Sequence, residues 1–215
     1  KTRIYGDANP ALTYTITGYV NGEGSSAHNG SPTVSTVANL ASNVGNLAIT
    51  AAANTLTSNN YSFSFANGTM TISPAALNVV GANTTSTYSG LSQTNRPANI
   101  AGLKNNDNFT ITGYGTGTNY NASAYADNLL ATPVTGTLAA NYTITYSNGG
   151  LNIAKANATI TGNSSNVIYS GQAQSVFGYT ANGLVNGETT AVLTNVNASG
   201  ANGTNAGIYT NIVTG

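Results

Sequence analysis

The sequence predicts an all-β fold made of tandem modules of about 80 residues, each a small β-sandwich of immunoglobulin-like type. Three observations predict it. Good helix formers are scarce, because charged residues make up only 5% of the 215 residues. Hydrophobic residues still reach 40%, which is enough for a packed core. Short alternating segments rich in Thr, Asn and Gly recur along the whole chain at one spacing.

The first alternating segments predict strands. Leu12–Thr17 alternates between apolar and polar residues, as a half-buried strand does, and Leu47–Thr50 suggests a further strand. Tyr61–Phe65 alternates in the same way and is followed by Asn67-Gly68, a pair that favours a type I′ turn. We therefore expect Thr69–Ile72 to return as the partner strand of a hairpin.

The same hairpin pattern returns later in the chain. Tyr142–Tyr146 is followed by Asn148-Gly149 and by Leu151–Ile153. Val192-Leu193 suggests another strand, while Asn186–Thr190 has residues that cap one short helical turn. A β-grasp-like sheet with one short helix is therefore the alternative to the sandwich.

Four landmarks recur in one order with a period of about 82 residues. The first is a tyrosine followed by glycine within two residues, the second a Gly-x-x-Asn-x-acid segment, the third an Asn-x-Gly or related segment, and the fourth an Asn-Tyr strand before Asn-Gly. Copies of the first landmark start at Tyr5, Tyr88 and Tyr169, and copies of the second start at Gly18, Gly102 and Gly183. Copies of the third start at Asn43, Asn121 and Asn205, and copies of the fourth start at Asn60 and Asn141.

The period divides the chain into three predicted domains. These are residues 1–75, in which a first strand is missing, residues 76–156, and residues 157–215, which are incomplete at the C-terminal side. We expect the parent protein to continue in both directions.

The landmarks resemble a known repeat family. Tyr5–Tyr14, the segment Val20–Glu23 and the strand pair from Asn60 resemble the MBG-type repeat of large bacterial surface adhesins. The second and third copies, with Tyr88–Gly90 and Tyr169–Gly171, are similar to the related YDG-type repeat, although Ser replaces the Asp of that signature. The resemblance covers essentially the whole chain.

The resemblance implies an exported protein without catalytic residues. Such repeats occur in filamentous-haemagglutinin-like, two-partner-secreted proteins, so it implies an extracellular location at the bacterial cell surface or in an extracellular matrix. We expect a stalk or spacer segment of an adhesin or biofilm-matrix protein, with neighbouring repeats as partners and other copies as partners in fibres. A module that binds glycans or a host surface is the alternative.

The chemistry of the side chains agrees with a non-enzyme. The chain has one histidine, His28, no cysteine and five acids, of which Glu23, Asp107 and Glu188 occupy one repeat position in different modules. They cannot form a catalytic dyad, and we expect them to support turns. One or two acids per repeat are too few for calcium, so we expect no metal and no cofactor.

Net charge and hydropathy exclude two classes of partner. The formal net charge is zero, which gives no attraction to nucleic acid. No segment approaches the roughly 18 apolar residues that span a bilayer, so we expect no membrane insertion.

Three tyrosines lie outside the repeated core pattern. Tyr114, Tyr120 and Tyr125 cluster in the second copy, and exposed tyrosines can stack on sugars. They are the candidate glycan contacts. The alternative is that they cover a long loop.

Overall fold

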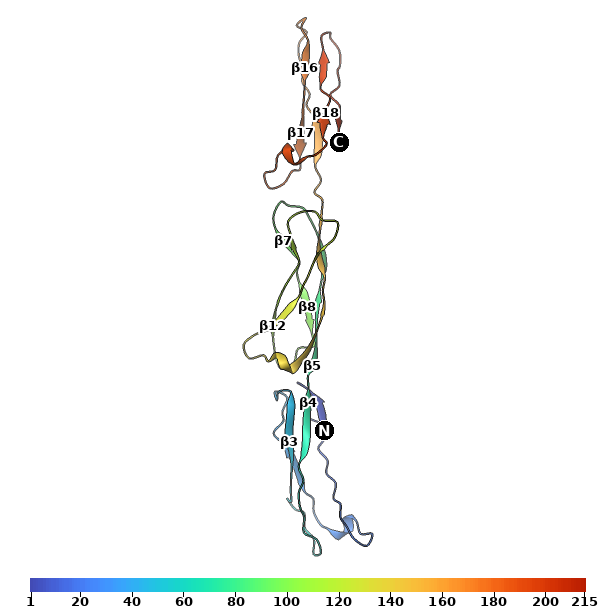
Figure 1. The fold of residues 1–215 in the computed structure, drawn as a ribbon, viewed down its shortest axis with the longest axis vertical. Helices are drawn as coiled ribbons and strands as arrows, with labels where there is room; N and C mark the ends of the chain where they lie inside the picture. Colours follow the sequence, from blue (N-terminus) through green and yellow to red (C-terminus); the bar gives the residue numbers. More distant parts are fainter. The chain divides into compact units, whose positions relative to one another are not determined.

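The predicted all-β class is confirmed. The computed structural model describes residues 1–215 and contains twenty short strands and no α-helix (Figure 1). The helical residues are confined to three 3₁₀ turns, Ser25–Ala27, Ala139–Asn141 and Thr190–Val192. Since the β-grasp alternative requires a helix against the sheet, the sandwich-like alternative is the one that fits.

The chain forms two compact units, each assembled from separate segments. Unit 1 contains residues 1–81, 97–113 and 128–148, and unit 2 contains residues 82–96, 114–127 and 149–215. The predicted domain boundaries, 1–75, 76–156 and 157–215, stay a prediction.

Unit 1 contains a four-stranded sheet in the order β1-β4-β3-β2. Its strands are β1 (Thr2–Ile4), β2 (Thr33–Thr36), β3 (Gly45–Ala52) and β4 (Gly68–Ser73). β1 runs parallel to β4, and the other neighbours are antiparallel. Met70 and Ile72 are fully buried, which places the core of this sheet along alternate residues of β4.

A second sheet of unit 1 has the order β13-β5-β8. Its strands are β5 (Ala75–Gly81), β8 (Ala98–Ala101) and β13 (Tyr142–Ser147), and the unit also contains the pair β9 (Phe109–Thr112) and β12 (Leu130–Pro133). Figure 1 shows β4 leading directly into β5. Ala75, Leu77 and Val79 are fully buried, while the residues between them are exposed, as the period of a strand requires.

Unit 2 has one three-stranded sheet, in the order β11-β14-β6. Its strands are β6 (Asn83–Thr87), β11 (Tyr125–Ala126) and β14 (Gly150–Ala154), with Leu151 and Ile153 buried. The other strands form antiparallel pairs. They are β7 (Gln93–Thr94) with β10 (Thr116–Gly117), β15 (Thr159–Gly162) with β17 (Tyr179–Asn182), β16 (Gln174–Val176) with β19 (Ala201–Gly203), and β18 (Asn197–Ala198) with β20 (Val213–Thr214).

The two predicted Asn-Gly hairpins are wrong. β13 pairs in parallel with β5, and β14 pairs in parallel with β6, so the two segments are not partners of each other. Tyr61–Phe65 forms no strand, and β4 pairs with β3 and β1. A type I′ turn needs positive φ at both central residues, and neither Asn67-Gly68 nor Asn148-Gly149 has it.

Other strand predictions had mixed outcomes. Leu47–Thr50 lies in β3 as predicted, whereas Leu12–Thr17 forms no strand. Val192 ends the 3₁₀ turn Thr190–Val192 and Leu193 follows it as the C-cap; the Thr189 side chain caps the start of the turn by accepting a hydrogen bond from the Ala191 N–H. The expected helical turn is therefore present, and the strand predicted there is not.

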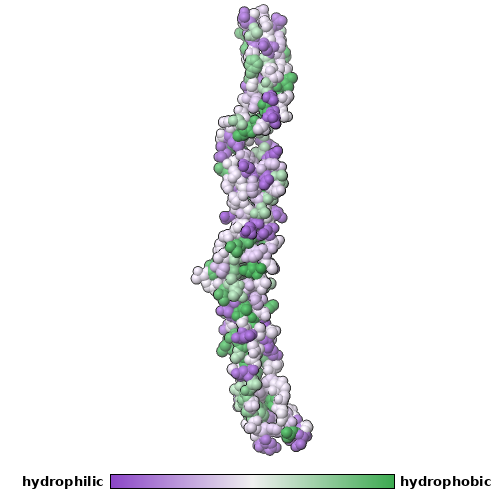
Figure 2. All heavy atoms as spheres, viewed as in Figure 1, coloured by the Kyte–Doolittle hydropathy of each residue, from purple (hydrophilic) through white to green (hydrophobic).

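The surface is weakly polar and mixed. Figure 2 shows hydrophobic residues as small separate areas among neutral and hydrophilic ones on the face in view. No helix of the structure has the length and apolar character needed to cross a membrane.

Candidate functional site

The second landmark forms one turn three times, which we call the acidic turn: Val20–Glu23, Lys104–Asp107 and Val185–Glu188. In each turn the two central residues have positive φ, as a type I′ turn requires. Their φ angles are 53° and 72° in Val20–Glu23, 51° and 62° in Lys104–Asp107, and 53° and 73° in Val185–Glu188. The N–H of each acid donates to the carbonyl of the first residue, at 3.0, 2.8 and 3.0 Å. The acids therefore have the turn role that the sequence predicted.

A tyrosine from the Asn-Tyr landmark binds two of these turns in the same way. The Tyr142 hydroxyl accepts from the Lys104 N–H at 2.9 Å and donates to the Asp107 carboxylate at 2.7 Å. The Tyr61 hydroxyl accepts from the Val20 N–H at 3.1 Å and donates to the Glu23 carboxylate. Each hydroxyl thus binds both ends of one acidic turn.

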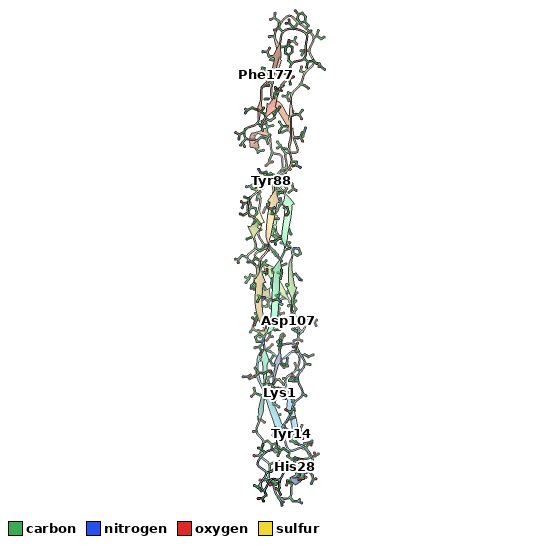
Figure 3. All side chains as sticks on the ribbon, turned by 90° about the vertical axis from the view of Figure 1, so that its right-hand side faces the viewer. Lys1, Tyr14, His28, Tyr88, Asp107 and Phe177 are labelled. Carbon is green, nitrogen blue, oxygen red and sulfur yellow. The ribbon has the colours of Figure 1, made fainter.

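A second tyrosine reaches the acidic turn from the preceding copy of the repeat. The Tyr5 hydroxyl donates to Asp107 at 3.0 Å in unit 1, and the Tyr88 hydroxyl donates to Glu188 in unit 2. Figure 3 labels Asp107 and Tyr88, one in each of these contacts. Both units therefore contain the same contact between one copy and the next, and we call this contact the repeat junction.

The same strand-end geometry positions both tyrosines. The Tyr5 N–H donates to the Ser73 carbonyl at 2.8 Å, where β1 leaves β4. The Tyr88 N–H donates to the Ala154 carbonyl at 2.8 Å, where β6 leaves β14. The parallel pairing of a first strand with a last strand thus fixes where the junction tyrosine emerges.

Aromatic rings pack together beside the junction in unit 1. Tyr5 and Phe109 each meet the Tyr142 ring edge to face, with centroids 5.6 and 5.5 Å apart. Tyr5, Phe109 and Tyr142 are 4%, 4% and 7% exposed. The hydrogen bonds to Asp107 therefore form beside a buried aromatic cluster.

Polar side chains add further contacts to the junction in unit 1. Lys104 forms an ion pair with Asp7 at 2.9 Å, and the Asn105 amide donates to the Leu40 carbonyl at 2.8 Å. Asn141, which is 1% exposed, accepts from the Val44 N–H at 3.0 Å and donates to Asn43 Oδ1 at 2.9 Å. The third landmark of one copy thus meets the fourth landmark of the next.

The tyrosines that bind the acidic turns make stability depend on pH. Burial and the hydrogen bond to Asp107 raise the pKa of Tyr142, and hydrogen bonds to Glu23 and Glu188 raise the pKa of Tyr61 and Tyr88. A raised folded-state pKa contributes stability that is present below the unfolded pKa of about 10 and is lost as pH rises through the folded value. We expect urea unfolding at pH 11 to show a lower free energy than at pH 8. Tyr142→Phe should reduce this difference, and an equal difference in the variant would contradict the assignment.

A second polar cluster, in unit 2, was not found by sequence reasoning. Asp127 is 4% exposed and accepts hydrogen bonds from the Asn95 amide, the Gly115 N–H at 2.8 Å and the Gly149 N–H at 3.1 Å. Asn95 is fully buried, and its amide also donates to the Ala82 carbonyl at 2.7 Å. The partners of Asp127 are two backbone N–H groups and one buried side-chain amide. The carboxylate therefore links segments of the fold that are distant in sequence.

The three candidate glycan contacts, all in unit 2, each have a partner of their own. Arg96 lies over the Tyr114 ring at 5.7 Å, and the Lys155 ammonium lies over the Tyr120 ring at 4.9 Å. Tyr125 lies in β11, and its hydroxyl donates to the Asn119 carbonyl at 2.9 Å. Tyr120 is the most open of them, at 49% exposure, and also lines a groove with Tyr88 and Glu188.

The histidine and the acidic side chains do not cluster. No group of three His, Cys, Asp or Glu residues is placed to hold a metal ion. His28 follows a 3₁₀ turn, and its Nδ1 lies 2.7 Å from the Tyr19 hydroxyl. The His28 ring stacks against the Tyr19 ring. Figure 3 shows His28 well apart from Asp107 within unit 1.

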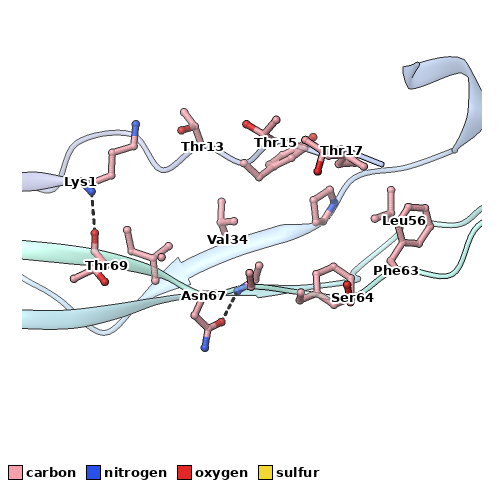
Figure 4. Close-up of a pocket in the computed structure, with 18 of the residues that line it drawn as sticks. Lys1, Thr13, Thr15, Thr17, Val34, Leu56, Phe63, Ser64, Asn67 and Thr69 are labelled. Atoms are coloured by element: carbon pink, nitrogen blue, oxygen red, sulfur yellow. Dashed lines mark hydrogen bonds between the residues drawn. The ribbon is translucent and has the colours of Figure 1, made fainter. Parts of the chain in front are cut away.

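A groove of unit 1 is lined by a single charged residue. It lies between residues 13–17 and 62–69, beside β2 and β3 (Figure 4). Its lining is mostly Thr, Ser and apolar side chains. Lys1 is its only charged residue, and the terminal amine of Lys1 donates to the Thr69 carbonyl at 2.8 Å.

Comparison with known proteins identifies the first repeat. The family described as MBG domain (YGX type) matches residues 1–71. No curated protein and no solved structure matches the chain. The YDG-type resemblance of the second and third copies stays a prediction. The Tyr5-Gly6 landmark, the acidic turn at Glu23 and all of strand β4 except its last two residues fall within the match, so residues 1–71 resemble an MBG domain of the YGX type.

Proposed function

We propose that the chain is a non-catalytic repeat segment of a long bacterial surface or biofilm-matrix adhesin, which acts as a stalk or spacer outside the cell. The repeat junction carries this proposal, because the same tyrosine-to-carboxylate contact occurs once in each compact unit. A contact that recurs from copy to copy lets further copies add by the same contact. The length of such an array grows with copy number.

Arrays of two, four and eight repeats test the spacer directly. Small-angle X-ray scattering should give a maximum dimension that grows linearly with repeat number, because each copy contacts mainly its neighbours. Growth with roughly the cube root of repeat number, as in a compact globule, would contradict the proposal.

Sedimentation of the same arrays tests self-association. With only 5% charged residues, copies hardly repel one another, and strand edges lack the lysines that normally prevent pairing. We propose that longer arrays associate weakly per repeat, with little change between low and physiological salt. If arrays of every length are monomeric, the self-association proposal fails and only the spacer role remains.

The alternative, a module that binds glycans or a host surface, has less support. A sugar stacks on an open ring face, and in Tyr114 and Tyr120 a cationic side chain lies over that face. Glycan-array binding that Tyr114→Ala or Tyr120→Ala abolishes would favour this alternative.

A further inference from the structure

The edge strand β2 of unit 1 has one side without a partner strand. The sheet order β1-β4-β3-β2 leaves β2 paired with β3 alone. No charged residue occurs between His28 and Arg96, so β2, β3 and β4 lack the lysines that normally protect an edge from pairing. Thr33 and Ser35 of β2 are exposed, and Val37, which follows the strand, is 79% exposed.

The backbone of β2 presents hydrogen-bonding groups on this open side. The Ala51 N–H of β3 donates to the side chain that precedes β4. Because backbone groups alternate along a strand, Thr50 bonds on the other side, toward β2, where it lies opposite Ser35. Ser35 therefore bonds toward β3, and its neighbours Val34 and Thr36 point their N–H and C=O groups to the open side.

The register of the strands shows which segment of the second copy corresponds to β2. In the first copy, Leu47 of β3 lies opposite Met70, and in the second copy Tyr125 of β11 lies opposite Leu151. Met70 and Leu151 hold one position of the repeat, since each follows its Asn-Tyr landmark at the same distance. The segment from β11 to β12 thus corresponds to β3. β9 lies opposite β12, so β9 and the following β10 hold the place of β2.

The corresponding edge has a partner strand in the other two copies. β10 pairs with β7 in the second copy, and β19 pairs with β16 in the third. The Asn95 N–H also donates to the Gly115 carbonyl at 2.8 Å, and by the register above Gly115 holds the position of Thr36. This side of the strand therefore accepts an antiparallel neighbour wherever one is supplied.

The first copy does not supply one. Counted from the junction tyrosine, Pro10 stands where the second copy has Gln93 of β7, and proline has no N–H to donate to a strand. A single side-chain contact lies there instead, from the Asn9 amide to the Ala38 carbonyl at 2.7 Å. No backbone group outside β3 bonds to the backbone of residues 33–37.

We propose that the open side of β2 pairs, antiparallel, with β2 of a second copy of this chain. The proposal rests on the self-association of arrays and names the contact that produces it. The pairing is symmetric: Val34 of one copy exchanges backbone hydrogen bonds with Thr36 of the other, and Ser35 lies opposite its own counterpart. Like charges directly opposite each other destabilise such a pair, and β2 contains none.

Disulfide trapping tests the pairing and its register. The chain has no cysteine, so one introduced cysteine reports one contact. Residues opposite each other without mutual hydrogen bonds have Cα atoms about 4.5 Å apart, which a disulfide can bridge. In a glutathione buffer, Ser35→Cys should form disulfide dimers about tenfold faster than Thr50→Cys. Thr50 is the matched control, because its exposed hydroxyl lies 3.1 Å from that of Ser35, one strand further from the edge.

Lysine substitutions test the same contact without a crosslink. Ser35→Lys places two like charges opposite each other and should weaken association in sedimentation about tenfold or more, whereas Thr50→Lys should leave it within about twofold. Circular dichroism checks that both variants fold. Equal trapping of the two cysteine variants, or no disulfide dimer of Ser35→Cys, would overturn the proposal. Association that persists in Ser35→Lys would also overturn it, while leaving self-association through another surface and the spacer role intact.

Discussion

Replacing Asp127 by Ala is expected to lower the free energy of unfolding by about 3–4 kcal/mol, the largest effect of any single change considered. The carboxylate is 4% exposed and is the partner of two backbone N–H groups, those of Gly115 and Gly149, and of the Asn95 amide. Alanine leaves the Gly115 and Gly149 N–H groups without this acceptor and leaves the Asn95 amide with the Ala82 carbonyl alone. Each such loss costs about 1–3 kcal/mol.

Urea unfolding followed by circular dichroism measures this change. The matched control is Asp7→Ala, which removes an ion pair whose Asp7 and Lys104 side chains are 46% and 36% exposed. Because solvent screens that pair, we expect a cost below about 1 kcal/mol. A similar, small cost for both variants would show that Asp127 has no structural role of its own.

Replacing Gly90 by Ala is expected to cost about 2–3 kcal/mol and to disturb the repeat junction of unit 2. Gly90 has φ of +71°, and an added Cβ would lie 2.6 Å from Asn186 Cβ in the acidic turn. The Asn186 amide also donates to the Gly90 carbonyl at 3.0 Å. The alanine therefore strains the backbone and also pushes the turn away.

Gly171 is the matched control at the same landmark position. Its φ is +72°, and nothing lies closer to an added Cβ than the Tyr169 hydroxyl at 3.9 Å. Gly171→Ala should show only the backbone cost of about 1–2 kcal/mol. Thermal unfolding of both variants separates the backbone cost from the cost of the contact with the acidic turn. Equal losses of stability in the two variants would mean that this contact contributes nothing.

Repetition was the most reliable information in the sequence. The all-β class and the turn role of Glu23, Asp107 and Glu188 followed from composition and from the recurring landmarks, and the structure has both. The sequence predicted these three acids in separate modules; each forms its own turn, and Glu23 and Asp107 lie in the same compact unit. It gave no sign that a tyrosine of the preceding copy binds two of them, because that contact spans about 100 residues.

The wrong hairpin predictions and the unpredicted role of Asp127 share a physical cause. Asn-Gly is a strong local signal for a hairpin, but Asn148-Gly149 separates two strands that both run parallel to earlier strands. Pairing between a first and a last strand is a tertiary choice, and local turn preference does not report it. Asp127 was missed for a similar reason, since its partners Asn95 and Gly149 are distant in sequence and meet only in the fold.

The central claim is that a tyrosine of one repeat holds the acidic turn of the next, and a double-mutant cycle on Tyr5 and Asp107 tests it most directly. Tyr5→Phe, Asp107→Ala and the double variant should give a coupling energy of about 0.5–3 kcal/mol in urea unfolding, because the hydroxyl donates to the carboxylate at 3.0 Å. Tyr5→Phe combined with Glu23→Ala, which removes the acceptor of the Tyr61 hydroxyl instead, should be additive within about 0.5 kcal/mol. Additive losses for Tyr5 and Asp107 would contradict the account.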